Sequence, residues 1–298
     1  MRRVLTLLAA ACCLATVGCS SAAAPGPAAS GAAGARPRPP ASYYLALGDS
    51  LSQGVQPNPQ GASVSTPAGY PDQLYAMLHR TRPGLRLVKL GCAGETTATM
   101  IHGGICRYAG GSQLAAAAGF LRAHRGHTAL ITLDIGANDA GSCMRRPSAA
   151  QLATCVARFI PQATGNLATI THRLRQASPG TQIIAMNYYL PALGAWRSGL
   201  GGRLLARVSE LVTDGYNHLL TRVYQANGVR VADVFSAFHT ASFSPQVSVP
   251  GLGPLPRNVA AICQWTWECT ARPRGPNIHP NQAGYQVIAH AFLAAGAR

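Results

Sequence analysis

The 298-residue sequence is poor in acidic residues: it has nine, against 25 lysines and arginines, so its formal net charge is +16. Lysine is scarce as well, because Lys89 is the only one and arginines supply the other positive charges. A surface this basic favours anionic partners such as phospholipid headgroups or wall polymers. A merely solvated cationic surface accounts for the same charge. No stretch combines clustered arginines with interleaved aromatic residues, so nucleic-acid binding is not expected.

Long apolar runs are missing after the first 19 residues, so no later stretch is expected to span a membrane. Residues 1–19 join two arginines to an apolar run that ends in small residues, which predicts a signal peptide and an exported protein. The end of this segment, Thr16-Val17-Gly18-Cys19, resembles a bacterial lipobox. A lipidated Cys19 would anchor the protein to the outer face of the cell membrane, whereas ordinary cleavage would release it. Residues 20–42 are rich in Pro, Ala, Gly and Ser and predict a disordered tether.

Paired Cys-x-x-Cys motifs are missing too and the histidines are scattered, so no metal site is predicted. Of the nine cysteines, three lie in the leader or at its end and six lie in the body of the chain. Six body cysteines in an exported chain indicate three disulfide bonds. Sequence alone leaves about 15 pairings open. Three pairs stand close together in sequence, namely Cys92 with Cys106, Cys143 with Cys155, and Cys263 with Cys269.

The body of the chain, residues 43–298, alternates predicted strands with predicted helices. The first strand is expected to begin near Tyr43. Four more are expected over residues 85–90, 128–135, 181–187 and 229–234. The helices are expected over residues 69–80, 112–124, 148–177, 203–226 and 280–295, with Pro161 kinking or splitting the third. The alternation predicts one domain, in which helices cover both faces of a parallel sheet.

Residues 236–276 break this alternation, because the segment is rich in proline and glycine. Long irregular segments in compact domains are usually functional or disordered. Trp265, Trp267 and the Cys263–Cys269 pair favour an ordered loop on the substrate side of the domain. The two tryptophans would suit a substrate wall and would equally suit anchoring of the loop to the core.

A short apolar run from Tyr43 to Leu47 ends abruptly in Gly48-Asp49-Ser50. It predicts a buried strand whose end presents a hydroxyl group, at the edge where α/β sheets open into a crevice. Glycine, aspartate and serine are also ordinary turn residues, so the tripeptide alone favours a turn. Three later segments add to it, namely Gly91-Cys92-Ala93-Gly94-Glu95, Gly136-Ala137-Asn138-Asp139 and His279-Pro280-Asn281.

With these four segments in this order, the chain resembles the GDSL, or SGNH, hydrolase family from about Tyr43 to the C-terminus. More closely, it resembles the secreted actinobacterial GDSL esterases and lipases that carry six cysteines. The resemblance implies a three-layer α/β/α, flavodoxin-like fold with a central, mostly five-stranded parallel sheet. It also implies three disulfide bonds between the three close pairs of cysteines.

The resemblance further implies a role for each of the four segments. Ser50 would be the nucleophile and His279 the general base. The Ser50 N–H, the Gly94 N–H and the Asn138 side-chain amide would form the oxyanion hole. An ordinary turn also suits Gly94, and an ordinary cap also suits Asn138.

The family usually has an aspartate three residues before this histidine, where it orients the imidazole ring, but here that position holds Pro276. Glu268 is the only acid in the 236–276 segment, and the sequence does not place it beside His279. We therefore expect a backbone carbonyl near Arg274–Asn277 to accept the ring N–H, which gives a Ser–His dyad. A loss of turnover of about a thousandfold in a folded Glu268→Gln variant would contradict the dyad.

Together, residues and resemblance predict an exported serine esterase or lipase that acts on small-molecule or lipid esters through an acyl-enzyme on Ser50. We expect it to be a monomer without metal or organic cofactor. An O-acetyl esterase acting on polysaccharide would use the same residues, and a catalytically inactive, basic surface-binding protein is a third hypothesis. The intact four segments argue against the third. The fold does not decide the substrate.

Overall fold

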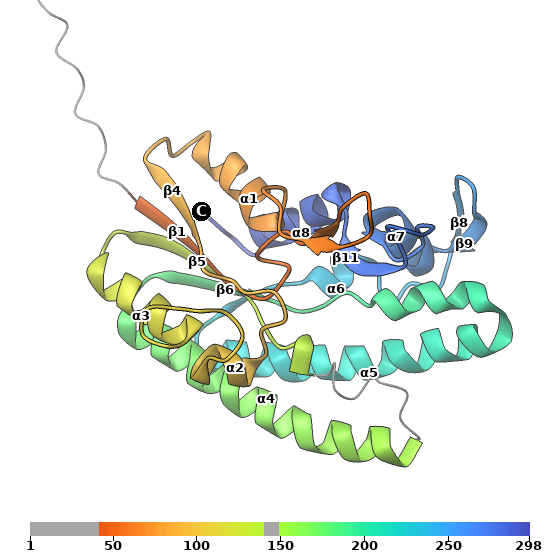
Figure 1. Cartoon of the computed structure of the whole chain (residues 1–298), viewed down its shortest axis with the longest axis horizontal. Helices are drawn as coiled ribbons and strands as arrows, with labels where there is room; N and C mark the ends of the chain where they lie inside the picture. The colour runs from red at the N-terminus through yellow and green to blue at the C-terminus, as the bar shows by residue number, and fades with distance from the viewer. Residues whose placement is uncertain (1–41, 140–148) are drawn as a thin grey trace, which may run out of the picture. The chain divides into compact units, whose positions relative to one another are not determined.

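The computed structural model describes residues 42–139 and 149–298 (Figure 1). The predicted signal peptide, the tether, Cys19 and the Cys143–Cys155 pair lie outside the residues whose side chains are described. The core is a parallel sheet in the order β4-β1-β5-β6-β7. Its strands are β1 (Ser42–Gly48), β4 (Leu85–Lys89), β5 (Thr128–Asp134), β6 (Gln182–Met186) and β7 (Arg230–Ala232). The predicted five-stranded parallel sheet is confirmed.

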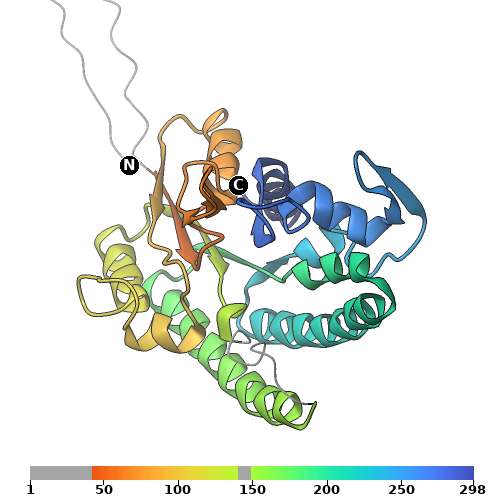
Figure 2. The same cartoon turned by 45° about the vertical axis from the view of Figure 1, so that its right-hand side comes forward.

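The central strands are apolar on both faces because helices cover both. In β1, four successive residues from Tyr44 to Leu47 have no exposed surface, although their side chains alternate between the two faces. One face carries α1 (Tyr70–His79) and α8 (Gln282–Ala294), which pack on each other. The other carries α2 (Thr97–His102), α3 (Gln113–Ala123), α4 (Ala149–Ala177) and α5 (Gly199–Ala226) (Figure 2). The predicted three-layer α/β/α arrangement is therefore confirmed.

Helix α4 runs through Pro161 without interruption, so the predicted split is wrong. Pro161 and Ala157, whose carbonyl loses its partner because proline has no N–H, both lie on the exposed side of the helix. Water can satisfy that carbonyl, and the Thr164 hydroxyl donates to the Ile160 carbonyl at 2.9 Å. The proline is therefore tolerated where a buried one would break the helix.

About half of residues 236–276 forms regular elements, so the segment is less irregular than predicted. The region contains α6 (Val234–Ala237), a hairpin of β8 (Gln246–Val249) and β9 (Gly253–Pro256), and α7 (Arg257–Trp265). Helix α7 buries Val259, Ala260 and Ile262, a short apolar stripe that the surrounding prolines and glycines hide in the sequence. The predicted Cys263–Cys269 disulfide is present. Trp265 packs edge-on against Phe238, which supports the anchoring interpretation for that residue.

The remaining elements are two short antiparallel strand pairs and a 3-10 helix. Strand β10 (Thr266–Trp267) pairs antiparallel with β11 (Asn277–Pro280), and a second small hairpin joins β2 (Gln56–Pro57) to β3 (Ser63–Val64). A 3-10 helix, η2 (Pro191–Ser198), leads into α5, which begins earlier than predicted. Strand β11 lies next to β2, so the histidine segment reaches the loop that follows β1.

Candidate active site

The turn that presents Ser50 depends on Gly48, the last residue of β1. Gly48 has φ +133°, and a Cβ there would lie 2.1 Å from the Asp134 carbonyl oxygen, so no other residue fits. The Asp49 N–H donates to the same carbonyl at 3.0 Å, which holds the turn against the end of β5. The chain leaves the sheet sharply and the Ser50 side chain stays partly exposed.

His279 reaches Ser50 from the other end of the chain. Its Nε2 lies 3.0 Å from the Ser50 Oγ, across 229 residues of sequence. Strand β11 carries the histidine, and the Tyr189 hydroxyl holds that strand by donating to the Ile278 carbonyl at 2.8 Å. Just after it, Asn281 caps α8 by accepting from the Gly284 N–H. The structure thus brings together the two residues that the sequence proposed as nucleophile and base.

The second ring nitrogen of His279 bonds to a side chain, so the predicted backbone acceptor is wrong. The His279 Nδ1 lies 2.8 Å from the Asn277 Oδ1, which also accepts the His279 backbone N–H at 3.0 Å. Two donors on one atom identify it as the amide oxygen. The Asn277 Nδ2 in turn donates to the Ser63 Oγ at 3.1 Å. Asparagine reaches forward by two residues here, a short-range turn contact that its side chain commonly makes.

No carboxylate hydrogen-bonds His279 in the described part of the chain, and burial lowers the pKa of its ring to about 4. Glu268, the acid considered from sequence, lies against Gly194, where a Cβ would come within 2.7 Å of the Glu268 Cγ. Burial raises the pKa of the Glu268 carboxyl. The structure therefore places no acid where the family usually has its aspartate.

The three predicted oxyanion donors differ in whether they are already hydrogen-bonded. Neither the Ser50 N–H nor the Gly94 N–H donates to another described residue, and Gly94 is exposed with φ +84°. The Asn138 amide is engaged: its Nδ2 donates to the Glu95 carbonyl at 2.9 Å and to the Asp49 Oδ2 at 3.2 Å. Asn138 therefore ties the second and third segments to the first.

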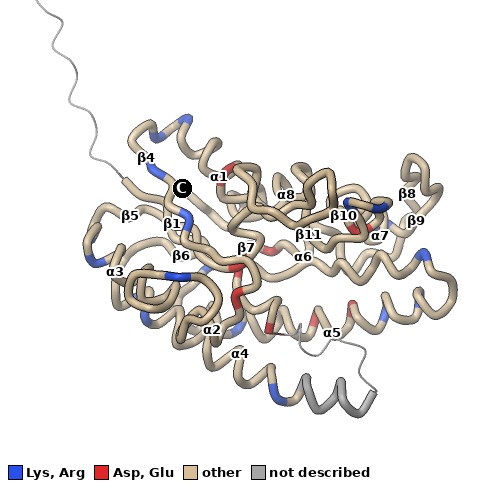
Figure 3. Tube along the Cα trace, in the orientation of Figure 1, with Lys and Arg blue, Asp and Glu red and all other residues tan. Residues whose placement is uncertain are grey.

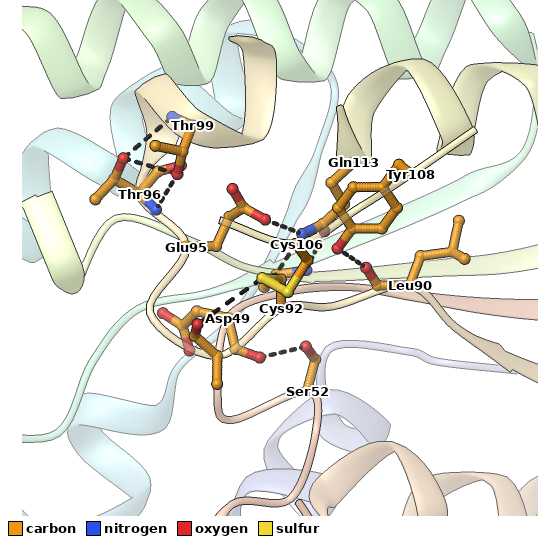
Figure 4. The surroundings of a disulfide bond; sticks show 12 residues. Asp49, Ser52, Leu90, Cys92, Glu95, Thr96, Thr99, Cys106, Tyr108 and Gln113 are labelled. Carbon is orange, nitrogen blue, oxygen red and sulfur yellow. Dashed lines mark hydrogen bonds between the residues drawn. A yellow bond between two sulfur atoms is a disulfide. The ribbon is translucent and has the colours of Figure 1, made fainter. Parts of the chain in front are cut away.

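Gln113, at the start of α3, is a site residue that sequence reasoning missed (Figure 4). Its Oε1 accepts the Gly48 N–H at 2.7 Å, while its Nε2 donates to the Gly48 carbonyl at 2.9 Å and to the buried Glu95 at 3.1 Å. The Cys92–Cys106 disulfide, predicted from the resemblance, fixes the same loop, and the Cys92 N–H donates to the Gly48 carbonyl at 3.0 Å. These bonds hold the Gly94 loop against the end of β1.

Asp134 was also missed, because it ends a strand and belongs to no motif. Its Oδ2 accepts the N–H groups of Asp49 and Ser52, each at 3.1 Å, and its Oδ1 accepts the Tyr70 hydroxyl at 2.6 Å. Burial raises the pKa of Asp134 well above its usual range and raises that of Asp49 to about 6. The Ser50 turn therefore lies on a buried network of carboxyl groups and hydrogen bonds.

We expect Gln113→Ala to lower the free energy of unfolding by about 2–4 kcal/mol, because the Gly48 N–H and Glu95 are left buried without their partner. A loosened Gly94 loop should also lower kcat/KM for an ester about tenfold. Urea unfolding and ester kinetics measure the two effects. The matched control is Gln176→Ala, an exposed glutamine on α4, which should change neither quantity. Wild-type behaviour of both variants would show that the Gln113 contacts do not support the site.

In residues 42–139 and 149–298, no helix has the length and hydrophobicity that a membrane span needs. Within the same residues, no group of three or more His, Cys, Asp and Glu side chains could hold a metal ion.

Comparisons with solved structures found several hydrolases of the same fold. An extracellular lipase from Streptomyces rimosus is 20% identical with a TM-score of 0.56, covering 87% of this chain and 100% of its own. LAE5, an alpha/beta hydrolase from the metagenome of Lake Arreo, is 22% identical with a TM-score of 0.52 over 86% of this chain and 95% of its own. Axe2, an acetylxylan esterase from Geobacillus stearothermophilus, is 17% identical with a TM-score of 0.52 over 86% and 94%.

A comparison with curated proteins gave no match. A family model describing GDSL-like lipases and acylhydrolases matches residues 46–287, which include the Ser50 turn, the Gly94 loop, Asn138 and His279. That range covers most of the chain and both ends of the site. The chain belongs to the GDSL-like lipase/acylhydrolase family.

Proposed function

We propose that this protein is an exported serine esterase that hydrolyses carboxylic esters, with Ser50 as nucleophile and His279 as general base. The 3.0 Å contact between the Ser50 Oγ and the His279 Nε2 carries the proposal. It joins a weak nucleophile to a base within hydrogen-bond reach, which acyl transfer requires. Export rests on the predicted signal peptide, and attachment through a lipidated Cys19 remains part of the proposal.

In the first step the Ser50 oxygen attacks the ester carbonyl while the His279 Nε2 takes its proton. The same nitrogen then protonates the departing alcohol, leaving an acyl group on Ser50. A water molecule repeats the sequence and releases the acid. Throughout, Asn277 keeps Nδ1 protonated, so the lone pair stays on Nε2. Asn277 thus completes a Ser–His–Asn arrangement in which a neutral amide takes the place of the usual acid.

The N–H groups of Ser50 and Gly94, which have no acceptor among the described residues, are the first two donors for the tetrahedral intermediate. For Asn138 to be the third, its amide has to exchange one of its two present bonds. The longer one, 3.2 Å to Asp49, is the one we expect to yield. Asp49 would keep the Leu51 N–H on its Oδ1 at 3.0 Å, whereas its Oδ2 would lose the Asn138 donor.

Ile278, the neighbour of His279, favours an apolar substrate. Ile278 is 56% exposed and adjoins the proposed base in sequence, so an acyl chain or apolar alcohol could contact it. We therefore propose a carboxylesterase or lipase acting on apolar esters, as a monomer. The O-acetyl esterase remains the second candidate, since lipases and an acetylxylan esterase share the fold.

The proposal is tested by hydrolysis of p-nitrophenyl esters from acetyl to palmitoyl, together with labelling by a fluorophosphonate. We expect activity that rises beyond the acetyl ester, and a single label that peptide mass spectrometry locates on Ser50. A sharp preference for acetyl would favour the O-acetyl esterase. A folded protein that neither turns over esters nor takes the label would favour the inactive binding protein.

We expect kcat/KM to stay high down to acidic pH, with its acid limb at about pH 4. A general base must be neutral, and burial lowers the His279 pKa from 6.5 to about 4, so the ring remains neutral above that value. The same shift makes protonation unfavourable in the folded state, so His279 should reduce stability as pH falls below 6.5. A pH–rate profile with a soluble ester measures the limb. A fall in kcat/KM near pH 6 would instead report the titration of Asp49. An acid limb of kcat/KM at pH 6.5 would contradict the burial of His279.

A further inference from the structure

The amino ends of the strands form the edge of the sheet opposite the active site, and this edge is rich in positive charge. Because its five strands are parallel, all their amino ends lie at one edge and all their carboxyl ends at the other. Ser50 follows the carboxyl end of β1. At the amino edge lies an open pocket of about 460 Å³. Four of the residues that line it are arginines, namely Arg82, Arg175, Arg230 and Arg298.

These arginines come from separate parts of the fold. Arg82 lies in the loop before β4, and Arg175 ends the last turn of α4 before β6. Arg230 begins β7, and Arg298 follows α8. Residues 180–183, where the chain enters β6, also line the pocket. The topology therefore gathers onto one pocket four side chains that the sequence spreads over more than 200 residues.

None of the side chains that line the pocket is acidic. All nine acids of the chain lie within the described residues, and none lines the pocket. Four of them end or follow strands at the opposite, carboxyl edge, namely Asp49, Glu95, Asp134 and Asp233. Among the described residues Lys89 forms an ion pair with Asp72 and the His218 ring lies 3.4 Å from the Asp214 carboxyl, and neither contact includes a pocket arginine. In Figure 3, blue segments (Lys and Arg) lie on the turn that leads into β4, and red segments (Asp and Glu) lie nearer the carboxyl edge of the sheet.

One of the guanidinium groups is held in place by hydrogen bonds, and a second lies beside Gly296. The Arg175 Nη1 donates to the Thr181 carbonyl at 2.7 Å and its Nη2 donates to the Gly228 carbonyl at 2.9 Å. The Arg230 Nη1 lies 2.6 Å from the point where Gly296 would carry a Cβ, so a side chain at that position would displace it. A fixed guanidinium loses less freedom when it binds, and its remaining N–H groups match the geometry of an oxyanion.

We propose that this pocket binds a phosphate-type oxyanion, either free phosphate or the phosphate of a lipid headgroup. Four like charges around one pocket repel each other, and a bound anion would reduce that repulsion. Arginine forks recognise phosphate by paired hydrogen bonds. The pocket lies at the opposite edge of the sheet from Ser50, so its occupation is independent of the proposed ester chemistry.

The test is thermal unfolding of the full protein in sodium phosphate, against sodium chloride of the same ionic strength and pH. Phosphate at about 100 times its dissociation constant should raise Tm by about 5 °C. Arg82→Gln/Arg230→Gln should abolish this rise. Its control, Arg122→Gln/Arg173→Gln, removes the same charge from a second surface pocket and should keep it. A rise that survives in both variants, or none in the wild type, would overturn the proposal.

Unfolding in chloride alone shows whether the pocket variant still folds, and Arg230→Lys serves as the second variant if it does not. Lysine keeps the charge but loses the fork, so a weakened phosphate response would support the proposal and an unchanged one would reduce it to general charge attraction. Sedimentation with phosphatidylglycerol vesicles, with and without competing free phosphate, separates the two sources. Vesicle binding that phosphate displaces and Arg82→Gln/Arg230→Gln removes would identify the headgroup, whereas a thermal response without vesicle binding would identify the free anion.

Discussion

Replacing Ser50 with alanine should lower kcat/KM for a p-nitrophenyl ester by about 10⁴- to 10⁶-fold. The change removes the atom that forms the acyl-enzyme, so no residual covalent pathway remains. It should leave the free energy of unfolding nearly unchanged, because the Ser50 Oγ is partly exposed and its bond to the Asp49 Oδ1 is long, at 3.4 Å. Kinetics and urea unfolding on the same preparation measure both quantities.

The pairing of Ser50 with His279 makes a sharper test than either residue alone. His279→Ala should cost nearly as much as Ser50→Ala, and the double variant should be no worse than the first, because the two residues act as one unit. Ser65→Ala and His290→Ala are the matched controls, since both side chains are exposed and lie outside the site. Additive losses in the double variant would mean that the 3.0 Å contact is not the catalytic one.

The motif positions and the alternation of strands with helices could be predicted from the sequence, because both depend on local residue patterns. The apolar run before Ser50 and the runs at β5 and β6 correctly predicted strands of a parallel sheet. Two of the three cysteine pairs are present as predicted from the resemblance. Helix α7 was missed because prolines and glycines flank it, and the packing of its buried stripe against the rest of the chain outweighs those local breakers.

The supporting residues of the site could not be predicted in the same way. Gln113 reads as an ordinary helix-start residue, and Asp134 reads as the end of an apolar strand. Their importance comes from what the sheet order brings beside them: the end of β1 in both cases. Asn277 lay within the segment that sequence reasoning chose, yet the choice fell on its backbone. The oxygen that faces the imidazole is decided by the backbone conformation where the loop enters β11. No sequence pattern predicts that conformation.

The role of Asn277 is tested by two substitutions with opposite expected results. Asn277→Ala should lower kcat about 10- to 100-fold with little change in KM, because the imidazole loses the acceptor that fixes its tautomer and direction. Asn277→Asp keeps that acceptor and adds a negative charge beside the ring. It should restore kcat at pH 8 to within about tenfold of the wild type, because a carboxylate stabilises the imidazolium at least as well as an amide does.

The pH–rate profile then distinguishes a positioning residue from a merely structural one. A carboxylate at position 277 favours the charged imidazole, so the His279 pKa should rise from about 4 and the acid limb of kcat/KM should move towards neutral pH. Any step that belongs to Asp49 should stay near pH 6. Glu268→Gln is the control, since that carboxyl makes no bond to His279 in the described structure, and both kcat and the limb should stay unchanged. An acid limb that does not move in Asn277→Asp, or a thousandfold loss in Glu268→Gln, would show that another group orients the histidine.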